Sequence, residues 1–418
     1  MGNGNGAHSK KAPPRRHLTR LLVGAAVVAA ASGGVGMLLT RAAAAPDGAG
    51  SGGISAPAAA TASGSSTTGW AEGSSLQPVT AAAVGPAGGR LGPTTPITVT
   101  YTGRPPLSLR PTLQPPVAGS WTVSGRVATF VPAADWPPYS HVTVTVPPPS
   151  GHTLAGSSPA TSASSSPATS AGARTATFTT PPISLLRAQQ ILARLGYLPV
   201  TFSSTAPAPA TAAAETAFGY DPPPGTFTWR SASLQATLGP LWVPGQATTV
   251  TTGALMAFQA DHQLSVDGIF GPQTWAALVQ ADLADHEPPK PYTTVVANLN
   301  APETLTVEVD GNPVLTSPVN SGIAGARTPA GTFPIFERLP STTMRGTMPD
   351  GVSYVDPNIR WVNYFYEGDA IHGFVRAAYG FPQSNGCLEL PVATAQKVYG
   401  LLHLGDLVTV AGTFSQAG

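Results

Sequence analysis

Residues 370–373 read Ala-Ile-His-Gly, and residues 383–391 read Gln-Ser-Asn-Gly-Cys-Leu-Glu-Leu-Pro. A free thiol has a pKa of about 8.5, so Cys387 needs a base such as the imidazole of His372 to become a nucleophile at neutral pH. Gly386 permits a tight turn before the cysteine, and backbone N–H groups at such a turn can stabilise an oxyanion. The pattern therefore predicts a cysteine–histidine nucleophilic site.

Composition excludes several other classes of protein. Cys387 is the single cysteine among 418 residues, so an intrachain disulfide and a thiolate cluster are impossible. The formal net charge of +1 provides no basic surface for nucleic acid. His372 and Cys387 are too few ligands for zinc, and the remaining histidines show no ligand spacing. We therefore expect no metal, no other cofactor and no nucleic-acid partner.

The N-terminus has the pattern of an export segment. Residues 10–20 carry five Lys or Arg, residues 21–40 carry no charge, and Arg41 follows them. An apolar helix of this length spans about 30 Å, the thickness of a bilayer core, and the basic residues before it favour a cytoplasmic N-terminus. We expect a single-pass anchor with the rest of the chain outside the cytoplasm. The alternative is a signal peptide cleaved within residues 42–45, with secretion to the cell wall.

A structural role for Cys387 and His372 is the competing interpretation of the motif. A lone cysteine is most often a small buried hydrophobe, and a lone histidine is most often structural. Here, however, the cysteine follows a polar Ser-Asn-Gly turn rather than lying in an apolar run. A free thiol in an exported chain is also exposed to oxidation, which argues against an idle cysteine.

The first half of the chain predicts a flexible linker at residues 46–76 and a β-sandwich at 77–182. The linker is rich in Gly, Ala, Ser and Thr. Short alternating runs between Pro and Gly turns, clearest at residues 141–146, are typical of a sandwich. The heptapeptide Ser-Ser-Pro-Ala-Thr-Ser-Ala occurs twice within residues 157–171 and predicts a disordered loop. The expected strands are residues 96–101, 121–123, 126–132, 141–146 and 175–179.

Residues 183–287 change to a helical period. Apolar residues mark one face of a first helix that ends at Gly196. Thr252 is expected to cap a second helix that carries Phe258, and Gly271-Pro272 begins a third. A long insertion at residues 199–250 separates the first helix from the other two.

Residues 288–418 return to a β pattern. A meander is expected at residues 293–299, 304–309 and 313–319. One late helix is expected at residues 391–402, followed by a strand at residues 407–410.

Three resemblances give these regions a common context. Residues 119–138, with Trp121 and Trp136, resemble a bacterial Ig-like domain of cell-wall enzymes, with a generic β-sandwich spacer as the alternative. The segment Ala-Phe-Gln followed by Asp-Gly-Ile-Phe-Gly-Pro and Thr-Trp, within residues 257–275, resembles a three-helix peptidoglycan-binding domain. A helical spacer without affinity is the alternative there.

Residues 291–412 resemble the L,D-transpeptidases. Their signature is a histidine at a strand end, followed later by Ser-His-Gly-Cys. Residues 327–333, Arg-Thr-Pro-Ala-Gly-Thr-Phe, match the Thr-Pro-x-Gly-x-Phe segment of that family. Tyr354, eighteen residues before His372, matches a tyrosine that lines the substrate pocket.

The chain departs from the family signature at two positions. Asn385 stands where the family usually has a second histidine, and Glu389 stands where it has Arg or Asn. Arg376 is a candidate replacement for that missing cation. The sequence leaves open whether Glu389 repels a donor carboxylate or pairs with Arg376.

The resemblance implies that Cys387 attacks the third residue of a donor stem peptide in peptidoglycan and that His372 protonates the departing D-Ala. An acceptor amine would resolve the thioester and form a 3→3 cross-link, and carbapenems would acylate the cysteine. The Gly373 carbonyl would orient the imidazole, and the N–H groups of Gly386 and Cys387 would bind the oxyanion. The side chains implied to contact substrate are Ser384, Asn385, Tyr354, Arg376 and Glu389.

The expected fold is a mainly β, multidomain chain. Its parts are a cytoplasmic tail and transmembrane helix at residues 1–45, a linker at 46–76, an Ig-like sandwich at 77–182, a three-helix peptidoglycan-binding domain at 183–287, and a β-rich catalytic domain with one late helix at 288–418. The expected partners are peptidoglycan and the cell membrane.

Two rival functions remain open from the sequence. Water in place of the acceptor amine would make the protein an L,D-carboxypeptidase with the same catalytic residues. Alternatively, drift at Asn385 and Glu389 would leave a non-catalytic wall-binding protein.

Overall fold

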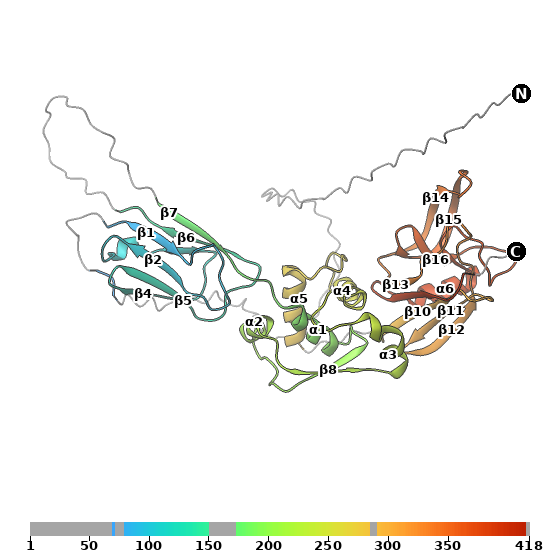
Figure 1. The fold of residues 1–418 in the computed structure, drawn as a ribbon, viewed down its shortest axis with the longest axis horizontal. Helices are drawn as coiled ribbons and strands as arrows, with labels where there is room; N and C mark the ends of the chain where they lie inside the picture. The colour runs from blue at the N-terminus through green and yellow to red at the C-terminus, as the bar shows by residue number, and fades with distance from the viewer. Residues whose placement is uncertain (1–68, 72–78, 150–172, 285–290, 415–418) are drawn as a thin grey trace, which may run out of the picture. The chain divides into compact units, whose positions relative to one another are not determined.

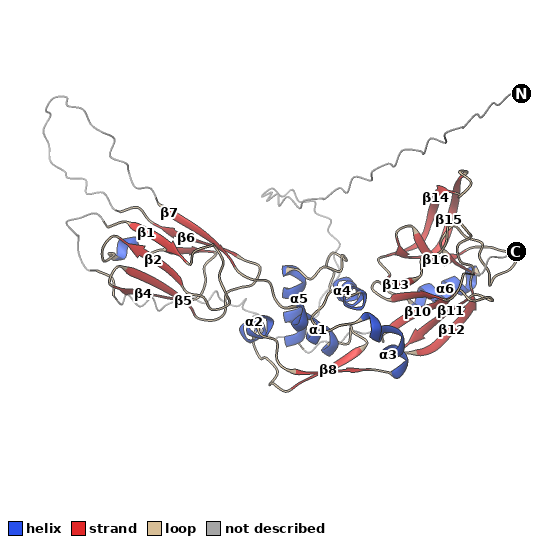
Figure 2. Ribbon diagram, in the orientation of Figure 1, coloured by secondary structure: helices blue, strands red, loops and turns tan. Residues whose placement is uncertain are grey.

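The structure, a computed structural model, describes residues 69–71, 79–149, 173–284 and 291–414. The expected anchor, most of the linker and the repeated heptapeptide lie outside these ranges. Within them, no helix is long and apolar enough to cross a membrane. The described chain is mainly β, and most of its helices fall in residues 185–283 (Figures 1 and 2).

The first β unit consists of two antiparallel sheets. One has the order β1-β2-β5-β4 and the other β3-β6-β7. Strand β6 buries Val142, Val144 and Val146 because alternate side chains point to one face of a strand. The ring of Phe130 lies 5.4 Å from that of Trp121, within the core between the sheets. The strands are β1 (Ala81–Gly85), β2 (Ile97–Tyr101), β3 (Thr112–Gln114), β4 (Gly119–Ser124), β5 (Val127–Pro132), β6 (His141–Val146) and β7 (Arg174–Thr179).

The helical unit contains more than the three expected helices. The expected ones are α1, α4 and α5, while the insertion at residues 199–250 adds the hairpin β8–β9 and the helices α2 and α3. Helix α4 begins one turn earlier than expected, because Thr248 rather than Thr252 accepts the capping hydrogen bond from Thr251 N. The elements are α1 (Leu185–Arg194), β8 (Val200–Ser204), α2 (Ala212–Tyr220), β9 (Gly225–Trp229), α3 (Ala232–Leu238), α4 (Thr249–Asp261) and α5 (Pro272–Leu283).

Gln259 ties α4 to the turn before α5. Its buried side chain accepts hydrogen bonds from Asp267 N at 3.1 Å and Gly268 N at 2.8 Å, and it donates to Asp267 Oδ1 and Ile269 O. One amide therefore satisfies several backbone groups that the core would otherwise leave unpaired.

The C-terminal unit is built from two sheets and one helix. The sheets have the orders β12-β11-β10-β18-β13 and β14-β15-β16-β17, and α6 packs on β15 and β16 (Figure 1). Val295, Ile371 and Val398, from a strand of each sheet and from α6, share one buried core. The elements are β10 (Thr293–Asn298), β11 (Thr304–Val309), β12 (Asn312–Pro318), β13 (Gly331–Pro334), β14 (Glu337–Thr347), β15 (Ser353–Tyr366), β16 (Asp369–Gly373), β17 (Leu388–Leu390), α6 (Val392–Leu401) and β18 (Leu407–Ala411).

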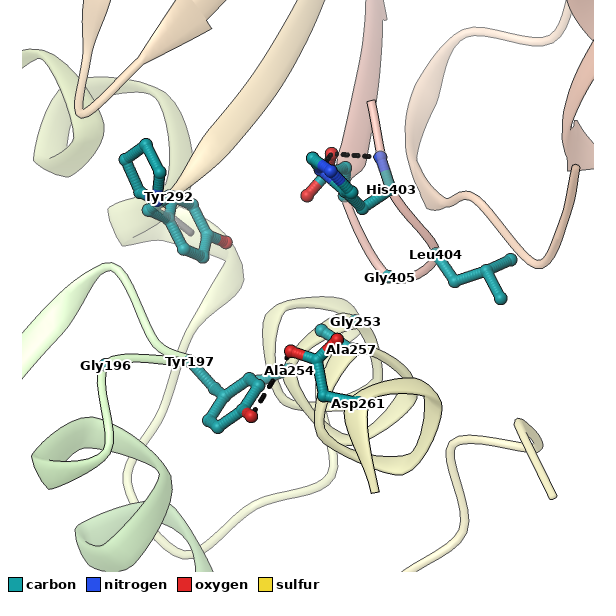
Figure 3. A pocket seen from close by; sticks show the side chains of 12 residues that line it. Gly196, Tyr197, Gly253, Ala254, Ala257, Asp261, Tyr292, His403, Leu404 and Gly405 are labelled. Carbon is teal, nitrogen blue, oxygen red and sulfur yellow. Dashed lines mark hydrogen bonds and ion pairs between the residues drawn. The ribbon is translucent and has the colours of Figure 1, made fainter. Parts of the chain in front are cut away.

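Helix α4 also packs against the turn that precedes β18. Gly253 and Gly405 approach so closely that a Cβ on Gly253 would lie 2.6 Å from the Gly405 carbonyl oxygen. A small cavity of about 40 Å³ lies beside this contact, with Tyr197, Asp261 and His403 among its lining residues (Figure 3). It lacks the cysteine, so the chemistry lies elsewhere.

Candidate active site

Parallel pairing of β16 and β17 creates the site. Its register pairs His372 with Glu389 and Gly373 with Leu390. Cys387 immediately precedes β17. Because the two strands are parallel, it lies beside the first half of β16, and it lines the same cavity as His372. Two segments fifteen residues apart in sequence are thereby joined at one sheet edge.

The Cys387 thiol rests on the hairpin turn between β15 and β16. Its Sγ lies 3.9 Å from the Gly368 carbonyl oxygen. Burial raises the pKa of the thiol to about 12, with the carboxylates of Asp369 and Glu389 adding to the rise and a hydrogen bond with the Ala370 backbone opposing it. The resting side chain is therefore a protonated thiol at neutral pH.

His372 is held as a neutral base. It is 2% exposed, and its Nδ1 lies 3.2 Å from the Gly373 carbonyl oxygen. Because a carbonyl only accepts, we assign the proton to Nδ1, which leaves Nε2 with a free lone pair. Burial lowers the pKa of the imidazole, so it is uncharged at neutral pH. The Gly373 carbonyl thus contacts the imidazole in the way that the resemblance to the L,D-transpeptidases implies.

Cys387 and His372 line one cavity without bonding to each other. Among the described residues, Sγ contacts the backbone at the start of β16 instead, with Gly368 O at 3.9 Å and the Ala370 backbone beside it. Both side chains line the narrow cavity, so the two groups share one space. Such contacts commonly tighten when substrate binds, so the resting geometry is compatible with proton transfer.

Ser384 shapes the turn rather than facing open solvent. Its Oγ donates to the Cys387 carbonyl at 2.6 Å and accepts from Gly386 N at 3.2 Å, and it is 3% exposed. Thr328 Oγ1 donates to the Gly386 carbonyl at 2.7 Å. The Gly386 N–H, expected to bind an oxyanion, thus already has a partner in the resting state, which leaves the Cys387 N–H as the more available donor.

Position 386 requires glycine for two reasons, its backbone conformation and the nearby Asp369 carboxylate. Its φ of +118° lies in the region that favours glycine. A Cβ at this position would overlap the Asp369 carboxylate. The turn before the nucleophile therefore excludes every other residue type.

Arg376 and Glu389 form a bidentate ion pair. Nε and one terminal nitrogen of the guanidinium each lie 2.7 Å from a carboxylate oxygen. The same guanidinium donates to the Gln383 carbonyl at 3.3 Å and lies 4.5 Å from the centre of the Phe374 ring. The sequence left open whether Glu389 repels substrate or pairs with Arg376. In the structure Arg376 neutralises the Glu389 carboxylate, so its guanidinium is already paired.

Asn385 and Tyr354 form a wall of the site. Asn385 Nδ2 lies 2.7 Å from Met348 Sδ, and its side chain hydrogen-bonds Tyr354. Burial, together with the charge of a Cys387 thiolate, raises the pKa of the Tyr354 hydroxyl, so it stays protonated. Asn385 Oδ1 is buried and, among the residues described, has no hydrogen-bond partner. A buried acceptor of this kind is available to a substrate N–H.

Two cavities meet at Cys387. The wide cavity has a volume of about 430 Å³, and the narrow cavity one of about 50 Å³. Both are lined by Met344, Tyr354, Asn385 and Cys387. The wide cavity also contains Thr343, Arg345, Tyr364, Gly368 and Asp369. The narrow cavity also contains Asp356, Ile359, His372, Phe374, Arg376, Ser384 and Glu389.

Asp369 and Tyr364 were missed by the sequence analysis. Both line the wide cavity, and burial raises the pKa of Tyr364, with the charge of a Cys387 thiolate adding to the rise. Asp369 lies only three residues before His372, so a charged residue beside the predicted catalytic strand was the signal that could have identified it.

No metal centre is suggested by the side chains. Across residues 69–71, 79–149, 173–284 and 291–414, no group of three or more His, Cys, Asp or Glu side chains is placed to hold an ion.

Comparison with protein families matches two parts of the chain. Residues 292–410 match the YkuD model, the L,D-transpeptidase catalytic domain, and residues 216–278 match a putative peptidoglycan-binding domain. No curated protein matches the sequence.

Similar solved structures include L,D-transpeptidases. One from Mycobacterium smegmatis is 16% identical, with 80% of this chain and 100% of that chain covered and a TM-score of 0.26. L,D-transpeptidase 3 from Mycobacterium tuberculosis, with a faropenem-derived adduct, is 15% identical over 79% and 97% of the two chains, with a TM-score of 0.26. The ertapenem-acylated catalytic domain from Enterococcus faecium is 25% identical over 30% and 99%, also with a TM-score of 0.26.

The matched catalytic region contains the whole Cys387 site, from the hairpin β14–β15 to β17. The matched peptidoglycan-binding region precedes it and includes α4. Residues 292–410 are therefore an L,D-transpeptidase catalytic domain, and Cys387, the single cysteine of the sequence, lies within it.

Proposed function

We propose that this protein forms 3→3 cross-links in peptidoglycan through a thioester on Cys387. The observation that carries the proposal is the meeting of two cavities at the nucleophile, with His372 in the wall of the narrow one. A transferase needs a donor and an acceptor to approach the same reactive atom, and two cavities that are both lined by Cys387 are compatible with this.

The first half-reaction would use the neutral thiol and imidazole together. His372 Nε2 takes the thiol proton as Cys387 Sγ attacks the carbonyl carbon of the third donor residue. The peptide C–N bond then breaks, and the imidazole returns that proton to the departing D-Ala nitrogen. The Cys387 thiol and the His372 imidazole are both uncharged at rest. Proton transfer during the attack on the carbonyl therefore creates the thiolate only when it is needed.

The second half-reaction would transfer the acyl group to the side-chain amine of an acceptor stem. The amine forms a new amide bond, the C–S bond breaks, and the sulfur regains a proton. Water in the same position would instead release a tripeptide, which is the carboxypeptidase outcome.

The Arg376–Glu389 pair supports an active enzyme over a drifted one. Glu389 would add an unbalanced negative charge to the site if it were alone, but its two oxygens are matched by one guanidinium. The Asn385 departure likewise retains polar chemistry, with one buried oxygen available to substrate.

The remaining regions would place this chemistry at the wall. We propose that residues 77–182 form an Ig-like spacer, a role supported by the two packed sheets of β1–β7. The peptidoglycan-binding domain would raise the local concentration of substrate by tethering. Residues 21–40 would anchor the protein in the cell membrane with the catalytic domain outside, or would be removed as part of a signal peptide.

Carbapenem acylation tests the nucleophile. Intact mass after meropenem treatment should show one adduct on the wild-type protein and none on Cys387→Ala, because this is the single thiol. Muropeptide analysis with donor and acceptor stems should then show 3→3 dimers. Folded wild-type protein without an adduct would contradict the catalytic proposal, and free tripeptide without dimer would establish a carboxypeptidase.

A further inference from the structure

The wide cavity places two opposite charges around the nucleophile. Asp369 and Arg345 both line it, together with Cys387. In the described part of the chain, neither charged side chain forms an ion pair with another residue. The nearby Arg376–Glu389 pair belongs to the narrow cavity instead. The wide cavity therefore offers one free anion and one free cation.

The position of Asp369 is built into the fold. It is the first residue of β16, and its carboxylate packs directly against Gly386, where a Cβ would overlap it. Its charge contributes to the raised pKa of both Cys387 and Tyr354, which places it close to the reacting sulfur. A carboxylate next to a cysteine nucleophile opposes thiolate formation, so Asp369 does not assist the acylation half-reaction.

Asp369 also has the protonation behaviour of a base. Partial burial and the neighbouring Glu367 raise the pKa of its carboxyl to about 6. The group is thus mostly ionised at neutral pH yet more basic than an ordinary aspartate. An unpaired, half-buried carboxylate gains most from a ligand that brings a positive charge.

We propose that Asp369 binds the ammonium group of the acceptor and takes a proton from it, while Arg345 binds the carboxylate on the same carbon. The ligand class is an α-amino acid end, with its amine directed at Cys387. The inference rests on the proposed transpeptidation and assigns its second half-reaction to named side chains.

The chemical step balances with the groups present. One proton leaves the acceptor ammonium for the Asp369 carboxylate, and the resulting amine attacks the thioester carbonyl. The new C–N bond forms and the C–S bond breaks. The second proton lost by nitrogen passes through His372 to the departing sulfur, and Asp369 later releases its own proton to water. The products are an amide, a thiol and a regenerated carboxylate.

The charge pattern also favours an amine over water. The carboxylate attracts an ammonium group but has no such preference for neutral water, so the local acceptor concentration rises beside the thioester. Loss of this charge should shift the fate of the acyl-enzyme from cross-linking towards hydrolysis.

Asp369→Asn is the decisive variant because it removes the charge and keeps the shape beside Gly386. We expect dimer formation to fall by about 10- to 100-fold, as for a lost contact with a charged group, and KM for the acceptor to rise. Meropenem acylation should be unchanged or faster, since the thiol loses a nearby negative charge. Glu337→Gln, which removes an exposed carboxylate from β14 outside both cavities, is the matched control and should transfer like the wild type.

Arg345→Gln tests the other half of the proposal. Acceptor stems would be compared with a free and with an amidated carboxylate on the amine-bearing carbon. Wild-type protein should prefer the free carboxylate, and the variant should lose that preference. If the wild type does not distinguish the two acceptors, the role of Arg345 is refuted.

A pH profile separates a base from a structural residue. Dimer formation should fall as the pH drops through the pKa of Asp369, because the protonated carboxyl no longer accepts a proton. Glu367→Gln should move this acidic limb to lower pH, since Glu367 raises that pKa. This test remains decisive if Asp369→Asn does not fold.

Two results would overturn the assignment of Asp369. One is an Asp369→Asn protein that makes dimers as fast as the wild type. The other is a parallel loss of acylation and transfer, which would indicate general damage to the site. By contrast, a wild-type protein that meropenem does not acylate would refute the proposed function itself rather than this acceptor site.

Discussion

Breaking the Arg376–Glu389 pair should lower the free energy of unfolding, and by a different amount for each partner that is removed. The carboxylate is 5% exposed, whereas the guanidinium is 29% exposed. Arg376→Gln leaves a buried anion, and we expect the free energy of unfolding to fall by about 3–5 kcal/mol, as for a broken buried pair. Glu389→Gln leaves a cation that can turn towards water, so a loss of about 1.5–3 kcal/mol is expected.

The single cysteine provides the assay for this prediction. Cys387 belongs to the catalytic domain, and its pKa is raised in the folded protein, so pulsed alkylation across a urea series becomes faster once that domain has unfolded. The two single variants and the double variant form a cycle. We expect the double variant to lose much less than the sum of the single losses. Additivity to within about 0.5 kcal/mol would refute the pairing.

The same variants should move the catalytic pH profile in opposite directions. Glu389 raises the pKa of His372 and Arg376 lowers it. Activity needs the neutral imidazole, so it is present above this pKa and is lost as the pH falls through it. Glu389→Gln should shift that acidic limb of carbapenem acylation to lower pH, and Arg376→Gln should shift it to higher pH. Shifts in the same direction would contradict the assigned geometry.

Three further predictions concern the turn before Cys387, the thiol itself and the helical unit. Gly386→Ala should abolish acylation and lower the melting temperature, because its Cβ would meet Asp369; wild-type behaviour would show that the turn is not so constrained. The alkylation rate of Cys387 in the resting enzyme should rise about tenfold per pH unit from pH 7 to 9 without a plateau, as for a thiol with a pKa of about 12, and a plateau below pH 9 would refute this state. Gln259→Leu should destabilise the helical unit by about 3 kcal/mol by leaving several buried backbone groups unpaired, seen as a lower calorimetric transition with acylation preserved.

Local patterns predicted about half of the elements, but not β1, β3, or the strands β13, β14 and β15. Strand β6, at residues 141–146, and the order of β10, β11 and β12 followed from alternation, because a period of two directly reflects one buried face. Gly271-Pro272 marked the start of α5 for an equally local reason, the fixed φ of proline. The insertion at residues 199–250 was not assigned any elements, although it contains β8, β9, α2 and α3. Its short elements pack against the larger helices, and such contacts leave little periodic signal.

The candidate site was predicted by residue type but not by its contacts. Cys387, His372, Tyr354 and Asn385 line the narrow cavity as a group. The sequence could not decide whether Glu389 repels substrate or pairs with Arg376, because these residues come from different segments. It also did not indicate that the thiol rests beside Gly368 rather than His372. Such choices depend on side-chain rotation and burial, which motif spacing does not encode.

The sequence by itself predicted Cys387 and His372 as candidate nucleophile and base, and it predicted the mainly β character of the chain, because these follow from residue chemistry and local periodicity. Only the tertiary structure decided how charge is distributed around that nucleophile. Parallel pairing of β16 with β17 brings His372 beside Glu389, and the close approach at Gly386 puts Asp369 next to the sulfur. Electrostatic energies vary with distance and burial, so the properties of the site appear only once the chain has folded.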